Sequence, residues 1–84
     1  MQETRSFRGI SKRLAIQYLE NLEGTKVDEG RVEGDGWVVT LSEQLVNPVG
    51  SIQLTEVTVE FEGDDSAVEP LIEDFARKAI RAGG

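Results

Sequence analysis

Apolar residues recur at helical spacing after residue 10 and predict a first helix that ends near Gly24. Ser11 has the right position and side chain to cap the N-terminus of this helix, and glycine commonly ends helices. The apolar side of the helix consists of Leu14, Ala15, Tyr18, Leu19 and Leu22. This side is expected to pack against the rest of the domain.

A longer apolar stripe near the C-terminus predicts a second helix. Ser66 and Glu69 have the spacing of a capping box, and Pro70 is expected in the first turn, where proline does little harm. Gly83 can terminate the helix. The stripe consists of Val68, Leu71, Ile72, Phe75, Ala76, Ala79 and Ile80.

Two segments in the first half of the chain are predicted to be strands. Thr4–Gly9 is expected to be short, with Phe7 on its inner side. Thr25–Glu33 is polar and interrupted by glycine, which indicates one edge strand or a bulged one. A Gly34-Asp35-Gly36 hairpin turn follows it.

Two further strands are predicted in the second half. The first alternates from Trp37 and fades near Leu45, and a turn is expected at Asn47–Gly50. In the second, Ile52–Glu62, the apolar residues change from even to odd positions. We expect a bulge at Thr55-Glu56 to switch the inward face, in preference to a strand that is covered on both faces.

The order of these elements is β-α-β-β-β-α. It predicts a single α+β domain over residues 1–84, in which two helices cover one face of a curved, four-stranded antiparallel sheet. The chain contains neither cysteine nor histidine. This composition excludes disulfides, Cys–His pairs, Ser–His–Asp triads and the usual zinc sites.

The net charge of −7 is distributed unevenly along the chain. Residues 1–13 and 77–84 each carry +3, whereas residues 14–76 carry −13. Such an acidic chain is expected to repel nucleic acids and anionic membranes. It is also typical of proteins from salt-loving organisms. Without a membrane-spanning stretch or a signal peptide, we expect a cytoplasmic protein.

Basic residues surround the predicted start of the first helix. The free N–H groups there, together with Arg8, Lys12 and Arg13, could hold a phosphate or a carboxylate. The alternative is a solvated basic face, or one that contacts an acidic patch of a partner. Of the acidic residues near the end of the last strand, Glu60 and Glu62 are expected to face solvent, and Asp64 and Asp65 are expected to help start the second helix. No residue has the setting of a catalytic acid or base.

Four segments together resemble a known family. They are TRSFRG (residues 4–9), VEGDGW (32–37), LTEVTV (54–59) and KAIRAGG (78–84). The resemblance is to the small domain that follows the β-grasp unit in proteins related to MoaD, the small subunit of molybdopterin synthase, and to stand-alone versions of this domain in halophilic archaea. It implies a TATA-binding-protein-like fold and supplies no catalytic residues. The β-grasp unit that would carry sulfur as a thiocarboxylate is missing.

We therefore expect a non-enzymatic domain that docks onto a protein of the molybdopterin or sulfur-transfer pathway, without a cofactor or a metal. The basic terminal elements or the open sheet face would form the contact. The candidate residues are Arg8, Lys12, Arg13, Arg77, Lys78 and Arg81.

Three other roles remain open. The C-terminal Gly83-Gly84 is either an ordinary helix end or the tail of a small carrier or modifier. The basic residues at the first helix could instead make the chain an anion- or metabolite-binding domain. A homodimer could form through the predicted edge strand Thr25–Glu33.

Overall fold

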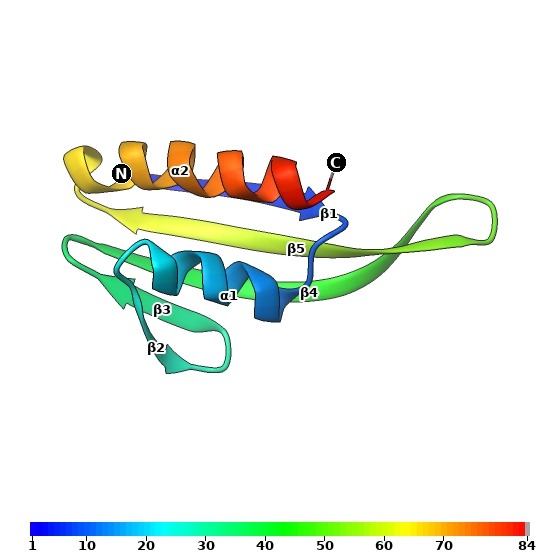
Figure 1. Cartoon of the computed structure of the whole chain (residues 1–84), viewed down its shortest axis with the longest axis horizontal. Coiled ribbons are helices and arrows are strands. Elements are labelled where there is room, and N and C mark those ends of the chain that lie inside the picture. The colour runs from blue at the N-terminus through cyan, green and yellow to red at the C-terminus, as the bar shows by residue number, and fades with distance from the viewer. Residues whose placement is uncertain (84) are drawn as a thin grey trace.

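The computed structural model describes residues 1–83, apart from the side chains of Pro48 and of residues 81–83 (Figure 1). The secondary structure consists of five strands and two helices in this described part. In chain order they are β1 (Gln2–Arg8), α1 (Lys12–Asn21), β2 (Thr25–Asp28), β3 (Arg31–Gly34), β4 (Trp37–Val49), β5 (Ile52–Gly63) and α2 (Asp65–Gly83).

The sheet is antiparallel throughout, with the strand order β1-β5-β4-β3-β2. It has five strands, so the predicted four-stranded sheet, with its TATA-binding-protein-like order, is wrong by one strand. The segment Thr25–Glu33 forms two short strands because a turn divides it at Glu29 and Gly30. The Asp28 carboxylate accepts a hydrogen bond from the Glu29 N–H at 2.6 Å, which is how aspartate stabilises turns.

Both helices cover the same face of the sheet, as predicted. Figure 1 shows α2 running along β1 and β5, while α1 lies over the neighbouring part of the same face, near β3 and β4. Strand register places Phe7 beside Val57, and Val39 beside Phe61, on this covered face. The buried side chains are Ile10, Ala15, Ile16, Leu19, Val32, Val39, Leu41, Val57, Val59, Phe61, Val68, Leu71, Ile72, Phe75 and Ala79.

Helix α1 begins and ends close to the predicted residues. The Ser11 hydroxyl accepts a hydrogen bond from the Leu14 N–H at 3.1 Å, which confirms the predicted cap. The helix ends before Gly24, but Glu23 rather than Gly24 takes the left-handed conformation, with a φ of 73°. Gly24 is needed for another reason, since a Cβ there would lie 2.6 Å from the Trp37 ring.

Helix α2 differs from the prediction in three details. It begins at Asp65, and the Asp64 carbonyl accepts the N–H groups of the first turn, so Ser66 lies inside the helix rather than at its cap. Pro70 consequently lies beyond the first turn. Ile80 was assigned to the buried stripe, but its side chain is 70% exposed. The remaining stripe faces the sheet.

Strands β4 and β5 continue beyond both helices as a two-stranded projection, which we call the arm (residues 44–55; Figure 1). The turn lies at Gly50-Ser51 rather than at Asn47–Gly50. The bulge expected at Thr55-Glu56 is absent, because β4 and β5 pair without interruption there, and the register shifts instead between Val46 and Val49. The apolar positions change parity because no helix covers the arm, so no face of it must point into a core.

Candidate functional site

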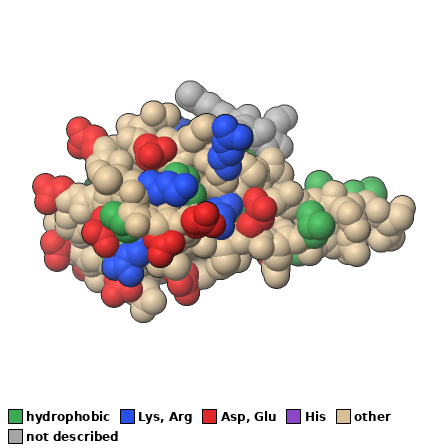
Figure 2. All heavy atoms as spheres, turned by 90° about the horizontal axis from the view of Figure 1, so that it is seen from below, with side chains coloured by type: hydrophobic (Ala, Val, Ile, Leu, Met, Phe, Trp, Pro, Cys, Tyr) green, Lys and Arg blue, Asp and Glu red, His purple; other side chains and the backbone are tan. Residues whose placement is uncertain are grey.

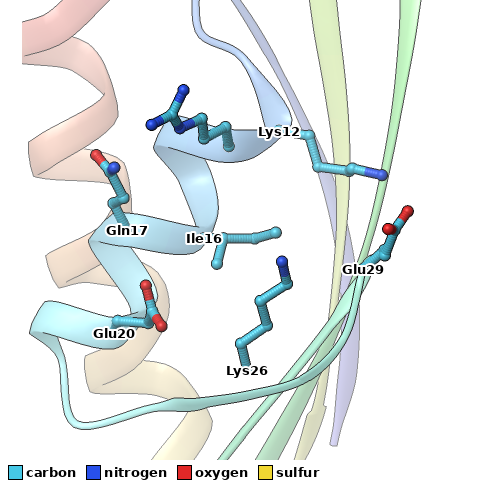
Figure 3. Close-up of a pocket in the computed structure, with 7 residues that line it drawn as sticks. Lys12, Ile16, Gln17, Glu20, Lys26 and Glu29 are labelled. Atoms are coloured by element: carbon cyan, nitrogen blue, oxygen red, sulfur yellow. The ribbon is translucent and has the colours of Figure 1, made fainter.

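A groove of about 480 Å³ lies between α1 and β2 and contains two of the predicted site residues, Lys12 and Arg13 (Figure 3). Lys26 reaches up from β2 toward Ile16, and the Lys12 amine points toward Glu29. The residues that line the groove are Lys12, Arg13, Ile16, Gln17, Glu20, Lys26 and Glu29. Three cations and two carboxylates make it only weakly positive.

The chain's own acceptors occupy the N-terminus of α1. The Glu43 carboxylate, which comes from β4, accepts a hydrogen bond from the Lys12 N–H at 2.6 Å. Ser11 accepts from Leu14. An external phosphate or carboxylate would have to displace Glu43. The Glu43 carboxylate also places a negative charge beside the basic residues of the first turn, Lys12 and Arg13. This arrangement does not favour the predicted anion site.

Arg8 lies on the opposite, uncovered face of the sheet. Its Nε donates to the Glu56 carboxylate at 2.9 Å, and the Gln44 side-chain amide donates to the same carboxylate at 3.2 Å. The Arg8 guanidinium, with Gln44, lowers the pKa of Glu56 below its ordinary value of 4.5. Because strand residues alternate between faces, Arg8 does not converge with Lys12 and Arg13.

The basic residues of α2 form a third, separate group. Arg77 and Lys78 line a groove of about 310 Å³ with Leu22 and Asp74, and Arg77 lies 3.4 Å from the Asp74 carboxylate. The side chain of Arg81 and the residue Gly84 lie outside the described part of the structure, while the described backbone of Gly83 still belongs to α2. Because Arg8 lies on the opposite face of the sheet from the groove that Lys12 and Arg13 line, the described basic side chains do not form one surface.

Two features that are common in catalytic and metal sites are absent from the described residues. None of their polar or charged side chains is buried, and no three acidic side chains gather where they could hold a metal ion. No helix among them has the length and apolar character needed to cross a membrane. Trp37 packs partly buried against the core.

Sequence analysis did not identify the arm as a surface. Its exposed apolar side chains are Leu45 (68% exposed), Val49 (67%), Ile52 (55%) and Leu54 (37%). Residues 44–55 contain no charged residue, although 30% of the chain is charged, and this run could have been found in the sequence. Figure 2 shows hydrophobic but no charged side chains on the projecting end, whereas acidic and basic side chains crowd the body.

Comparison with models of known protein families gives a match. The model of the family described as archaeal MoaD-like protein matches residues 3–84, which is nearly the whole chain. No curated protein matches it.

Proposed function

We propose that this chain, which belongs to the archaeal MoaD-like protein family, is a non-enzymatic protein-binding domain of a molybdopterin or sulfur-transfer system. The family membership supports the link to these pathways. The uncovered, uncharged arm is the observation that carries the binding role. The arm projects from one end of a molecule of 41 × 23 × 21 Å, where a partner can reach both of its faces.

The chemistry of the arm favours a protein as its partner. Its four exposed apolar side chains lie on both faces of the arm, since the register places Leu45 and Leu54 on opposite faces, and the rest of the chain is highly charged. Apolar surface removed from water contributes about 25 cal/mol per Å², and exposed apolar surface of this kind marks interaction sites. A nucleic acid would instead require cations along the contact, and the arm has none.

The two other functions considered from the sequence receive less support. An anion- or metabolite-binding domain would need the N-terminus of α1, where Glu43 already binds. A carrier would need an extended tail, but α2 continues as a helix through Gly83. Neither observation favours these functions over protein binding.

Binding to purified proteins of the pathway tests this proposal. The two subunits of the molybdopterin synthase from the source organism would each be titrated with the full chain in a calorimeter. We expect one of them to bind. The substitution Ile52→Lys should raise the Kd at least about tenfold, because a charge would enter an apolar contact.

The matched control is Val27→Lys on β2, since Val27 is 51% exposed and apolar but lies outside the arm. It should leave the Kd unchanged. A pair of charge reversals, Arg77→Glu and Lys78→Glu, tests the alternative that the basic residues form the contact. The proposed role of the arm is rejected if these reversals weaken binding and Ile52→Lys does not. Absence of binding to either subunit would reject the pathway link.

A further inference from the structure

One edge of β4 has no neighbouring strand along the arm. Strand β3 pairs with β4 only from Trp37 to Thr40, and the last backbone hydrogen bond on that side joins the Leu41 N–H to the Gly30 carbonyl at 2.7 Å. From Ser42 to Val49, β4 pairs with β5 on its other side alone within the described part of the chain. The outer edge of β5 is free for a much shorter length, because β1 pairs with it up to Glu56.

The direction of the backbone groups follows from this last hydrogen bond. Successive residues of a strand point their N–H and C=O groups to opposite edges. The Leu41 N–H points toward the β3 side of β4. The N–H groups of Glu43 and Leu45 therefore point to that same side, where β4 has no neighbouring strand. This edge therefore offers donors and acceptors to another strand.

Natural proteins usually protect such edges with charges, proline, bulges or short strands. The two outermost strands of this sheet follow the rule, since β2 has four residues that include Lys26 and Asp28, and β1 carries Arg5 and Arg8. The free edge of β4 is longer. It carries Glu43 at its start, and Pro48 and the register shift between Val46 and Val49 near its end, whereas residues 44–46 are uncharged and pair regularly with β5. Between these two protected ends the edge is open to another strand.

We propose that the edge of β4 in the arm pairs with the same edge of a second copy of this chain. Two identical strands that run antiparallel are related by a two-fold axis, so the contact is self-complementary and closes as a dimer. The two arms would then form one four-stranded ribbon. This is a different edge from Thr25–Glu33, where the sequence suggested dimerisation.

The net charge of the chain restricts where a second copy can bind. Each chain has a net charge of −7, so two bodies in direct contact would repel each other. The arms meet through uncharged residues and keep the bodies apart. Interactions between exposed charges fade beyond the Debye length, which is about 8 Å at physiological ionic strength.

The size of the arm connects the pairing with the proposed function, on which this inference rests. Stable interfaces contain about 20–30 residues on each side. One arm supplies only residues 44–55, whereas two arms side by side reach that size. Edge pairing leaves the apolar side chains on the faces of the ribbon, where they form a larger platform for the partner.

Sedimentation equilibrium of the full chain over a range of concentrations tests the inference. In about 1 M KCl, where the Debye length is about 3 Å, we expect a concentration-dependent dimer. Leu45→Pro removes an edge N–H, which proline lacks, and should raise the dimer Kd at least about tenfold. Leu45→Ala is the matched control, because it keeps the N–H and should retain the dimer.

Hydrogen exchange on the unmodified chain supplies a second measurement that does not depend on how the proline variant folds. The amides of Glu43 and Leu45 should exchange slowly at high protein concentration and faster on dilution. The inference is overturned if the chain stays monomeric at all concentrations, or if Val27→Lys disrupts the dimer and Leu45→Pro does not.

The two proposals fail in different ways. A monomeric chain whose binding to a synthase subunit is weakened by Ile52→Lys would reject the dimer and retain the binding role of the arm. A dimer that neither subunit binds would do the reverse.

Discussion

Glu23 holds a backbone conformation that glycine adopts far more easily. Its φ of 73° lies in the left-handed region, directly after the last turn of α1. The Gly24 N–H donates to the Leu19 carbonyl at 2.9 Å, and the Glu23 N–H donates to the Glu20 carbonyl at 3.2 Å. This is the hydrogen-bond pattern of a Schellman motif, in which glycine usually stands where Glu23 is.

We predict that Glu23→Gly raises the free energy of unfolding by about 0.5–1 kcal/mol, because it relieves the steric cost of a side chain in the left-handed region. Urea denaturation measures the change. The control is Glu20→Gly inside the helix, which should lower the free energy of unfolding by about 1 kcal/mol. Destabilisation by Glu23→Gly would contradict the assigned conformation.

Glu56 connects the pH dependence of stability to the base of the arm. Its pKa is lowered because Arg8, and then Gln44, donate to the ionised carboxylate in the folded state. A lowered pKa means that this contribution to stability is present above the ordinary pKa of 4.5 and is lost as the pH falls through the lowered value.

We predict that Glu56→Gln lowers the free energy of unfolding at pH 7, and that the difference from the unmodified chain shrinks as the pH falls toward 2. Urea denaturation at several pH values would measure it. Combining the substitution with Arg8→Met gives a double-mutant cycle that isolates the pair. A coupling that does not change with pH would show that the ionised Glu56 is not its source.

At the scale of elements, Phe75 is the main contact of α2 with the rest of the core. Its ring makes edge-to-face contacts with Phe7, Tyr18 and Phe61 at centroid distances of 5.1, 6.0 and 5.7 Å. These three partners come from β1, α1 and β5. One side chain therefore joins four elements.

We predict that Phe75→Ala lowers the free energy of unfolding by about 3–5 kcal/mol, because it removes buried apolar surface and leaves a cavity. Ile80→Ala on the same helix is the control and should have an effect of less than about 0.5 kcal/mol, since Ile80 is 70% exposed. Thermal or urea unfolding distinguishes them. Similar effects of the two substitutions would contradict the packing of α2.

The charge pattern of α1 is also explained at this scale. Lys12 and Arg13 stand in the first turn, where the helix dipole favours acids. The acid comes from another element, because Glu43 of β4 binds the Lys12 N–H. An acidic side chain of the same chain therefore lies at the turn where the sequence predicted an anion site.

At the scale of the whole molecule, the arm and the core are separate. Among the side chains that the structure describes, none of the buried ones lies within residues 44–55. Replacing Val46–Leu54 with Asn-Gly would join Leu45 and Thr55, which pair with each other, through a short hairpin turn.

We predict that this shortened chain keeps its fold, with a free energy of unfolding within about 1 kcal/mol of the original, because no core contact is lost. Circular dichroism and urea denaturation would establish this. The shortened chain should also lose self-association and binding of the partner. Unfolding of the shortened chain would show that the arm contributes to the core.

The features that depend on local periodicity could be predicted from the sequence alone. The sequence identified both helices, the Ser11 cap, the turn before Trp37, and the inward positions of Val57, Val59 and Phe61. These features could be read because the spacing of apolar residues and the chemistry of caps and turns act over a few neighbouring residues.

The extent to which the helices cover the sheet, and the contacts between residues distant in the sequence, depend on tertiary structure and could not be predicted from local patterns. The arm exists because β4 and β5 extend beyond the two helices that cover the rest of the sheet. The pattern of residues within either strand does not show how far the helices reach. The separation of Arg8 from Lys12, and the contact of Glu43 with α1, depend on strand register and on contacts between distant segments. Sites predicted from basic residues that are close in the sequence could not include Glu56 and Glu43, which are distant in the sequence and contact Arg8 and Lys12 in the fold.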